Sequence, residues 1–207
     1  MLLTEYRQFK VDKRLVEQSI EENKPLLVSG VIQRAEAKNQ NGRIYPTEIL
    51  MREIKSYIEG PIKERRATGE LDHPESSVIN LQNVSHHMTG IEIKGNDVYG
   101  TFEILSTPAG NILKELFRNN ITVGVSSRGM GSVEESIGED GDATVTVQDD
   151  FELLCWDFVS TPSTHGAYVA PTGLSENKII KPKFKYTKVN NIIRDIICDN
   201  TGVCSVC

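Results

Sequence analysis

The middle of the chain reads Val123-Gly124-Val125-Ser126-Ser127-Arg128-Gly129, where a predicted strand over residues 121–127 runs into a glycine-rich segment. Because side chains of a strand alternate between its faces, Ser126 and Ser127 should point to opposite sides, and one of them at most can be a nucleophile. Nearby glycines let a substrate approach the backbone, and backbone amides here could face a developing oxyanion. A glycine-rich turn without chemistry is the alternative.

An earlier stretch reads Gly69-Glu70-Leu71-Asp72-His73-Pro74 and places a histidine in a predicted loop. A neutral imidazole can take the proton of a serine hydroxyl, so the pair His73 and Ser126 is typical of a serine hydrolase. The third member of a triad would be an acid. Asp157 interrupts an apolar run, and a buried carboxylate needs a partner, which could be His73, an arginine or a backbone amide. His165 and Glu70 are alternatives for this third role.

The remaining patterns predict many short strands and two or three helices. A hairpin is expected from residues 84–94 and 98–105 around Gly95-Asn96-Asp97. Helices are expected near residues 47–58 and 112–117, the second entered through Thr107-Pro108. Residues 143–148 and 151–159 are predicted to pair, and the acidic segment 134–142 should be a loop or hairpin tip. The fold class is therefore α+β, with a mainly antiparallel, partly closed, barrel-like sheet flanked by helices.

The neighbouring histidines His86 and His87 lie within the first strand of that hairpin. Their rings should point to opposite faces, and we expect one exposed and one packed. His73 therefore has precedence over both as the catalytic base.

Three segments are expected along the chain: a charged N-terminal segment over 1–25, a catalytic domain over 26–174 and a basic tail over 175–207. A length of 207 residues is enough for one well-buried core. The net charge of −6 argues against a protein that binds nucleic acid through a wholly basic surface. No apolar run is long enough to span a bilayer, and the first residues lack the pattern of a secretory signal, so an intracellular location is expected.

Cysteines suggest no cofactor. Cys155 stands alone in an apolar run, and Cys198, Cys204 and Cys207 crowd the end of the chain. Three thiols without a nearby histidine make an incomplete zinc set, so the expectation is a tail with free thiols and no metal.

Four blocks of the sequence together resemble one known family. They are Asn41-Gly42-Arg43-Ile44-Tyr45-Pro46, Gly69-Glu70-Leu71-Asp72-His73-Pro74, Lys94-Gly95-Asn96-Asp97-Val98-Tyr99-Gly100 and Gly124-Val125-Ser126-Ser127-Arg128-Gly129-Met130-Gly131-Ser132. In this order they resemble the prohead core proteases of T4-like tailed phages, which are related in fold to the herpesvirus assembly proteases. The resemblance extends over roughly residues 26–172.

The resemblance implies a serine endopeptidase inside the immature capsid, or prohead, which assembles in the host cytoplasm. Its substrates would be scaffold and capsid proteins, cut after glutamate in an aliphatic-x-Glu pattern, and self-association is expected. His73 matches the general base, Ser126 the nucleophile and Asp157 the acidic position after the serine. A glutamate side chain needs a cationic or hydrogen-bonding site, for which Arg43 and Arg128 are candidates. Either arginine could instead form a structural ion pair.

The tail carries a further expectation. Leu174-Ser175-Glu176 fits the aliphatic-x-Glu pattern, and the polar and turn residues around it predict an exposed, flexible stretch, so self-cleavage is expected after Glu176. The positive charge of the tail could hold the precursor on an acidic scaffold or on segment 134–142 until cleavage. The same loose pattern ends at Glu17, Glu22, Glu64 and Glu115, the last within a predicted helix.

Two functions of other classes compete with the protease. One is a non-catalytic scaffold or assembly protein that keeps the fold, although intact serine and histidine motifs speak against it. The other is a different serine hydrolase such as an esterase. Its Gly-x-Ser-x-Gly elbow is nearly matched at residues 124–128 but lacks the final glycine.

Overall fold

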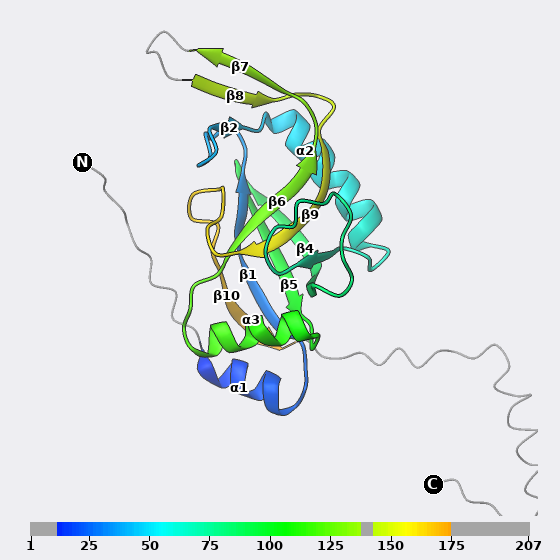
Figure 1. Cartoon of the computed structure of the whole chain (residues 1–207), viewed down its shortest axis with the longest axis vertical. Coiled ribbons are helices and arrows are strands. Elements are labelled where there is room, and N and C mark those ends of the chain that lie inside the picture. Colours follow the sequence, from blue (N-terminus) through cyan, green and yellow to red (C-terminus); the bar gives the residue numbers. More distant parts are fainter. Residues whose placement is uncertain (1–11, 138–142, 175–207) are drawn as a thin grey trace, which may run out of the picture. The chain divides into compact units, whose positions relative to one another are not determined.

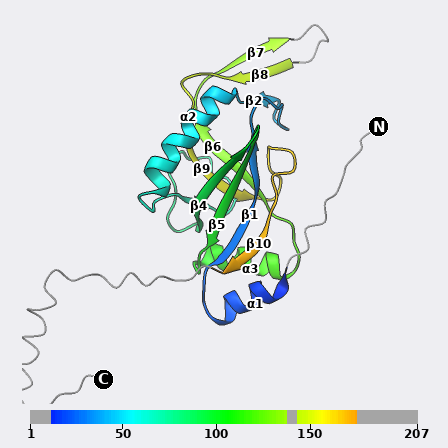
Figure 2. The ribbon, with the colours of Figure 1, turned by 180° about the vertical axis from the view of Figure 1, so that it is seen from behind.

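The computed structural model describes residues 12–137 and 143–174 (Figure 1). Its largest sheet has five antiparallel strands in the order β10-β1-β5-β4-β3. Figure 2 shows β10, β1, β5 and β4 side by side. Their bounds are β1 Leu26–Arg34, β3 Thr68–Glu70, β4 Val84–Lys94, β5 Asp97–Ile104 and β10 Val169–Leu174. β4 and β5 form the expected hairpin, and Gly95 in its turn has a φ of 62°, which a residue without a Cβ adopts readily.

Two smaller sheets complete the strands. β6 (Gly124–Met130) and β9 (Glu152–Val159) form an antiparallel pair. In the third sheet, β8 (Ala143–Val147) lies between β7 (Val133–Ile137) and the short β2 (Arg43–Ile44). It is antiparallel to β7 and parallel to β2. Because β8 pairs with β7, the predicted pairing of 143–148 with 151–159 is wrong. The segment 134–142, predicted as a loop or hairpin tip, is a strand over residues 134–137, which lie in β7, and residues 138–142 lie outside the described residues.

The class α+β with mainly antiparallel strands is confirmed, but the described residues form no closed barrel. The β6–β9 pair joins the large sheet through two isolated bridges, Leu71 with Phe158 and Gly124 with Tyr168. β3, at one edge of that sheet, has three residues, so few backbone groups are available there to extend the sheet toward closure. Three sheets therefore replace the single expected sheet, and a relation to the fold of the herpesvirus assembly proteases stays a prediction.

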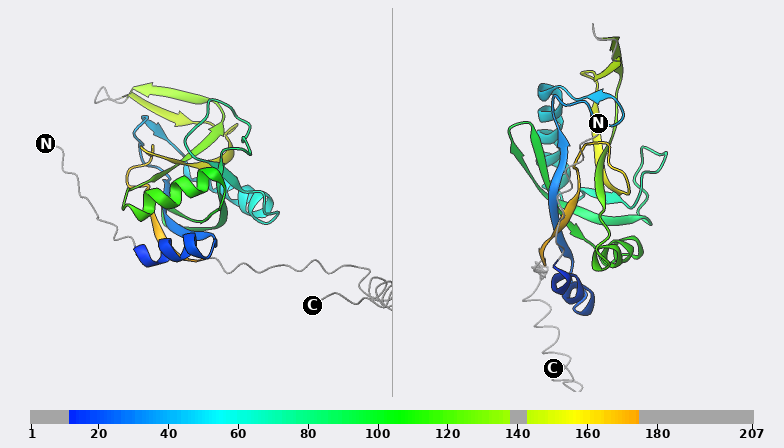
Figure 3. Two further views of the ribbon diagram at one scale, coloured as in Figure 1. Left: turned by 60° about the horizontal axis from the view of Figure 1, so that its bottom comes forward. Right: turned by 90° about the vertical axis from the view of Figure 1, so that its left-hand side faces the viewer.

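The helices lie outside these sheets. α1 (Lys13–Glu21) packs on α3 (Pro108–Arg118) beside the ends of β1 and β10 (Figure 3), whereas α2 (Thr47–Tyr57) continues into a π-helical turn, η1 (Ile58–Ile62), that contacts β4. α3 begins where the sequence predicts it, because the Thr107 hydroxyl accepts the Gly110 amide at 3.1 Å and Pro108 fits the first turn. None of the described helices is long and apolar enough to cross a membrane.

The core joins the large sheet to the β6–β9 pair. Phe102 of β5 and Phe158 of β9 are fully buried with their ring centroids 5.4 Å apart. His86 packs against both rings, and His87, on the opposite face of β4, lies 3.9 Å from a carboxylate oxygen of Glu103. Both histidines are buried, so the expected exposure of one ring is wrong: β4 is an inner strand of its sheet, and both α3 and η1 contact it.

Candidate active site

The register of β6 and β9 gathers polar side chains on one face. Ser126 lies directly opposite Asp157, and Arg128 lies opposite Cys155. Residues opposite each other in an antiparallel pair share a face, so these four side chains lie together. Ser127 lies opposite Trp156, a buried core residue, and therefore belongs to the other face. The two serines are thus divided between the faces, as the alternation predicts.

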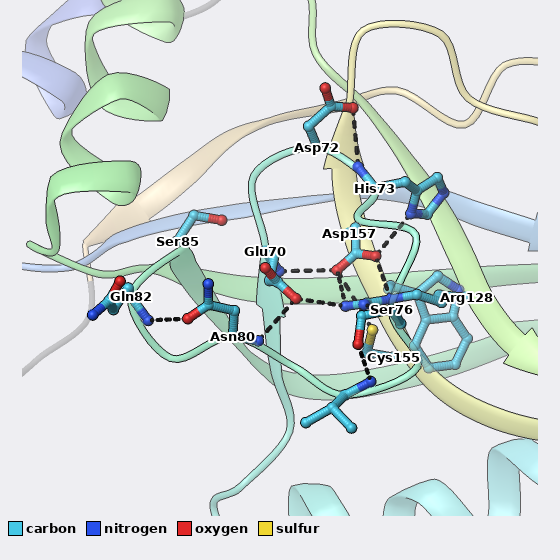
Figure 4. A network of polar contacts seen from close by, with 12 residues as sticks. Glu70, Asp72, His73, Ser76, Asn80, Gln82, Ser85, Arg128, Cys155 and Asp157 are labelled. Carbon is cyan, nitrogen blue, oxygen red and sulfur yellow. Dashed lines mark hydrogen bonds and ion pairs between the residues drawn. The ribbon is translucent and has the colours of Figure 1, made fainter.

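A tight turn after β3 brings His73 over this polar face. The Asp72 amide donates to the Phe158 carbonyl at 2.7 Å, which ties the loop to β9. Asp72 itself has a φ of 70°, a left-handed conformation that aspartate tolerates better than most residues, and its carboxylate accepts the His73 amide at 2.9 Å. The imidazole then lies with Nδ1 2.8 Å from Oδ2 of Asp157 (Figure 4).

Asp157 is fully buried, and four groups contact its carboxylate. Besides His73, Oδ1 accepts the Glu70 amide at 2.9 Å and Nη2 of Arg128 at 3.2 Å, and the Cys155 thiol lies 3.4 Å away. Burial alone would raise the pKa of Asp157, but the hydrogen bonds from His73 and the Glu70 amide, with the charge of Arg128, lower it below its ordinary value. Asp157 is therefore held as a carboxylate that accepts the proton on Nδ1 of His73.

Arg128 is the cation of this network rather than an open binding group. Its side chain is 9% exposed, and its Nε lies 3.0 Å from Oδ2 of Asp157. Nη2 also bonds Oε1 of Glu70 at 3.0 Å, and Nη1 bonds the Ser76 carbonyl at 2.7 Å. Arg128, one of the two arginines expected to bind substrate, thus forms the structural ion pair that the sequence left as an alternative, because two buried carboxylates occupy its donors.

Neither alternative for the third role, Glu70 or His165, contacts the His73 ring within the described part of the chain. Glu70 uses Oε1 to accept Arg128 and the Asn80 amide, at 3.0 and 3.1 Å. His165 is exposed and lines a separate small cavity beside Tyr45. Among the described residues, Asp157 is the carboxylate that contacts the His73 ring.

An open cleft of about 390 Å³ lies over the polar face. Segments 40–45, 126–129 and 161–163 contribute to its walls, together with His73 and Pro74. Oγ of Ser126 is hydrogen bonded to Oγ of Ser163 at 3.0 Å, and no hydrogen bond joins Ser126 to His73 in the described chain. Catalytic hydrogen bonds are often long without substrate, so this arrangement is compatible with a proton transfer between them.

Of two cleft residues, Arg43 was singled out from the sequence and Ser163 was not. Arg43, a candidate for binding a substrate glutamate, lines the cleft and has no ion-pair partner among the residues described in the structure. Ser163 was missed, because an isolated serine beside Pro162 carries no pattern that separates it from an ordinary turn residue.

Of the stretch around the expected cleavage site, the structure describes residues 171–174, which belong to β10. Pro171, Thr172 and Gly173, predicted as part of a flexible stretch, lie in β10, where backbone pairing with β1 overrides their turn preference. Leu174 ends this strand opposite Leu26. Glu176 and the cysteines at 198, 204 and 207 lie outside the described residues. Glu115 lies in α3 beside the buried Leu113 and Lys114, which confirms that the pattern ending there belongs to a packed helix.

Comparisons with known proteins agree on one family. The family model described as "Prohead core protein serine protease" matches residues 11–179. The prohead core protein protease of Enterobacteria phage T4 is 31% identical over 156 residues, which are 74% of this chain and 72% of that protein. The solved structure of the bacteriophage T4 capsid assembly protease matches with a TM-score of 0.59 and 29% identity, over 65% of this chain and 81% of that one.

Proposed function

The chain belongs to the prohead core protein serine protease family, a family of phage capsid assembly, and from this premise we propose that it is a serine endopeptidase with Ser126, His73 and Asp157 as its catalytic residues. The observation that carries the proposal is the 2.8 Å contact of His73 Nδ1 with the buried Asp157, at a cleft that Ser126 also lines. These three side chains supply a nucleophile, a base and the group that orients the base.

The protonation states follow from the contacts of Asp157. Because Asp157 is held as a carboxylate, it accepts the proton of Nδ1, and the lone pair of Nε2 is left to act as the base. Ser126 then loses its proton to Nε2 as Oγ attacks the scissile carbonyl. His73 returns this proton to the leaving amine, and water attacks the resulting acyl-enzyme by the same route.

We propose Arg43 as the residue that binds the carboxylate of a substrate glutamate. It lies at the cleft without an ion-pair partner in the described chain, whereas Arg128 is engaged by Glu70 and Asp157. A guanidinium can hold a carboxylate through two parallel hydrogen bonds, which favours glutamate over uncharged side chains. Cleavage after glutamate is thus assigned to one arginine rather than two.

The substrates and location follow from the family. The proposed substrates are scaffold and capsid proteins of the prohead, cut in its interior after assembly in the host cytoplasm, and self-association would concentrate the enzyme there. Self-cleavage after Glu176 is proposed as well. Because Leu174 is paired with Leu26, the end of β10 must separate from β1 before the aliphatic-x-Glu segment can enter a cleft as an extended chain.

A serine-reactive fluorophosphonate probe followed by peptide mapping tests the catalytic assignment. We expect the probe on Ser126 in the wild type, no labelling of Ser126→Ala or His73→Ala, and near-normal labelling of the matched control Ser127→Ala, which changes the other face of β6. Asp157→Asn should slow labelling by a factor on the order of 10⁴. Labelling of a different serine, or full peptidase activity in folded Ser126→Ala, would disprove the assignment and favour a non-catalytic assembly protein or another hydrolase.

A further inference from the structure

A second hydroxyl contacts the proposed nucleophile. Oγ of Ser126 lies 3.0 Å from Oγ of Ser163, at hydrogen-bond distance, and either oxygen could donate. Ser126 is buried and Ser163 is partly exposed, and both line the cleft of about 390 Å³. In the proposed reaction the Ser126 hydroxyl gives up its proton, so a group that is hydrogen bonded to the same oxygen acts directly on that step.

The segment that carries Ser163 is fixed on two sides. On one side the Gln40 amide donates to the Ser163 carbonyl at 2.8 Å, and Nε2 of Gln40 donates to the Pro162 carbonyl at 2.9 Å. On the other side Pro162 packs on β6 at Gly124, where a Cβ would lie only 2.6 Å from Cδ of the proline. The backbone of Ser163 is therefore held in place, and its hydroxyl lies beside Oγ of Ser126 before any substrate binds.

The protonation state of His73 decides which hydroxyl donates during the reaction. Asp157 is held as a carboxylate and accepts the proton on Nδ1, so Nε2 of His73 has a lone pair and no proton. Once Ser126 directs its proton to Nε2, that proton is no longer available to Ser163. Because each hydroxyl has a single proton, the hydrogen bond between the two serines must then run from Ser163 to Ser126.

We propose that Ser163 is a fourth catalytic residue, which donates a hydrogen bond to Oγ of Ser126 while that oxygen carries negative charge. This inference rests on the proposed function, because it needs Ser126 as the nucleophile and His73 as the base. A hydrogen bond to an ionised acceptor is roughly twice as strong as one between neutral groups. The bond therefore stabilises Oγ most when its proton has left and its bond to the carbonyl carbon is incomplete.

This state of Oγ occurs twice in each turnover. In acylation the Ser126 proton moves to Nε2 of His73 as the bond from Oγ to the carbonyl carbon forms. In deacylation water attacks the acyl carbon, the bond from that carbon to Oγ breaks, and Oγ takes a proton back from Nε2. Ser163 keeps its own proton and forms no covalent bond, so it changes the rates of both steps and not the products.

Two matched pairs of proteins test the role of this hydroxyl. The wild type and Ser163→Ala differ in the hydroxyl alone, and Ser163→Thr and Ser163→Val differ in it at the same branched shape. The probe is a small fluorophosphonate, and its attack by Ser126 corresponds to the first step of acylation. Loss of the hydroxyl should lower the maximal inactivation rate by about 10- to 100-fold in each pair, because a hydrogen bond to a charged group is lost.

Further measurements on the same proteins distinguish this role from a structural one. Within each pair, the probe concentration for half-maximal inactivation should differ by less than about 2-fold, since the hydroxyl acts on the reacting oxygen and not on binding. The midpoint of the pH dependence of inactivation, which reports the titration of His73, should stay the same. A displaced cleft wall would instead change the half-maximal concentration or the melting temperature.

The outcomes separate this inference from the proposed function. If the probe labels Ser126 and both pairs lose maximal rate without the hydroxyl, the role of Ser163 is supported. If Ser126 is labelled but either pair reacts at equal rates, or only the half-maximal concentration changes, the role is refuted and the catalytic assignment stands. Faster labelling without the hydroxyl would also refute it, because Ser163 would then be withholding the Ser126 proton. If the wild type is not labelled at Ser126, the proposed function fails, and the inference fails with it.

Discussion

Replacing Arg128 with methionine removes the cation from between two buried carboxylates. Glu70 and Asp157 are 1% and 0% exposed, and Arg128 contacts both within 3.2 Å. Removing one partner of a buried ion pair leaves an uncompensated charge and typically costs about 3–5 kcal/mol. For a chain of this size we expect the melting temperature of Arg128→Met to fall by about 6–20 °C.

A matched surface substitution separates this effect from the loss of an arginine as such. Arg118, on α3, is half exposed and lies 3.5 Å from Glu115, one turn away. Because exposed pairs contribute little, Arg118→Met should melt within about 2 °C of the wild type. Arg128→Lys keeps the charge but cannot reproduce the planar fork, and it should recover part of the loss.

The pH dependence adds a second measurement. In the wild type the pKa of Asp157 is lowered, so its contribution to stability is complete above its ordinary value of 3.8 and is lost as the pH falls further. In Arg128→Met, loss of the cation raises the pKa of Asp157 relative to the wild type, so the variant gains a proton at a higher pH and recovers stability relative to the wild type as the pH falls. Denaturant unfolding at pH 7.5 and 4.5 should show a smaller difference at pH 4.5. If Arg128→Met melts with the Arg118→Met control, the network does not stabilise the site.

Three further outcomes are expected. Burial lowers the pKa of His86 from 6.5 to about 4, so the unfolded chain takes up a proton more readily than the folded one. The free energy of unfolding should therefore fall by about 3 kcal/mol as the pH drops across that range, and an equally steep dependence on pH in His86→Gln would contradict this. Gly69→Ala places a Cβ 2.1 Å from the Trp156 carbonyl and should destabilise by about 2 kcal/mol or more, whereas Gly90→Ala, with nothing within 4 Å, should change little; equal unfolding midpoints would refute it. Intact-mass measurement should show that the active enzyme ends at Glu176, whereas Ser126→Ala keeps the full chain to Cys207. An uncleaved tail in enzyme that cuts other substrates would exclude self-processing.

Local patterns in the sequence were enough for the elements that carry their own signals. The hairpin around Gly95, the capped start of α3 at Thr107 and the division of Ser126 and Ser127 between two faces depend on neighbouring residues alone. The family, too, could be inferred from four motif blocks, and the comparisons confirm it. Turn chemistry, helix capping and the two-residue period of strands act over short stretches, so they can be read before the chain is folded.

Long-range pairing decided the rest. The chain pairs β9 with β6 rather than with β8, and this register places Asp157 opposite Ser126. The same packing turns Arg128 toward two carboxylates, and Arg43 is left without an ion pair among the described side chains. A period specifies which side chains share a face of a strand but not which strand will lie beside it. That choice depends on the joint burial of apolar faces and charges from distant segments, which exists only in the folded chain.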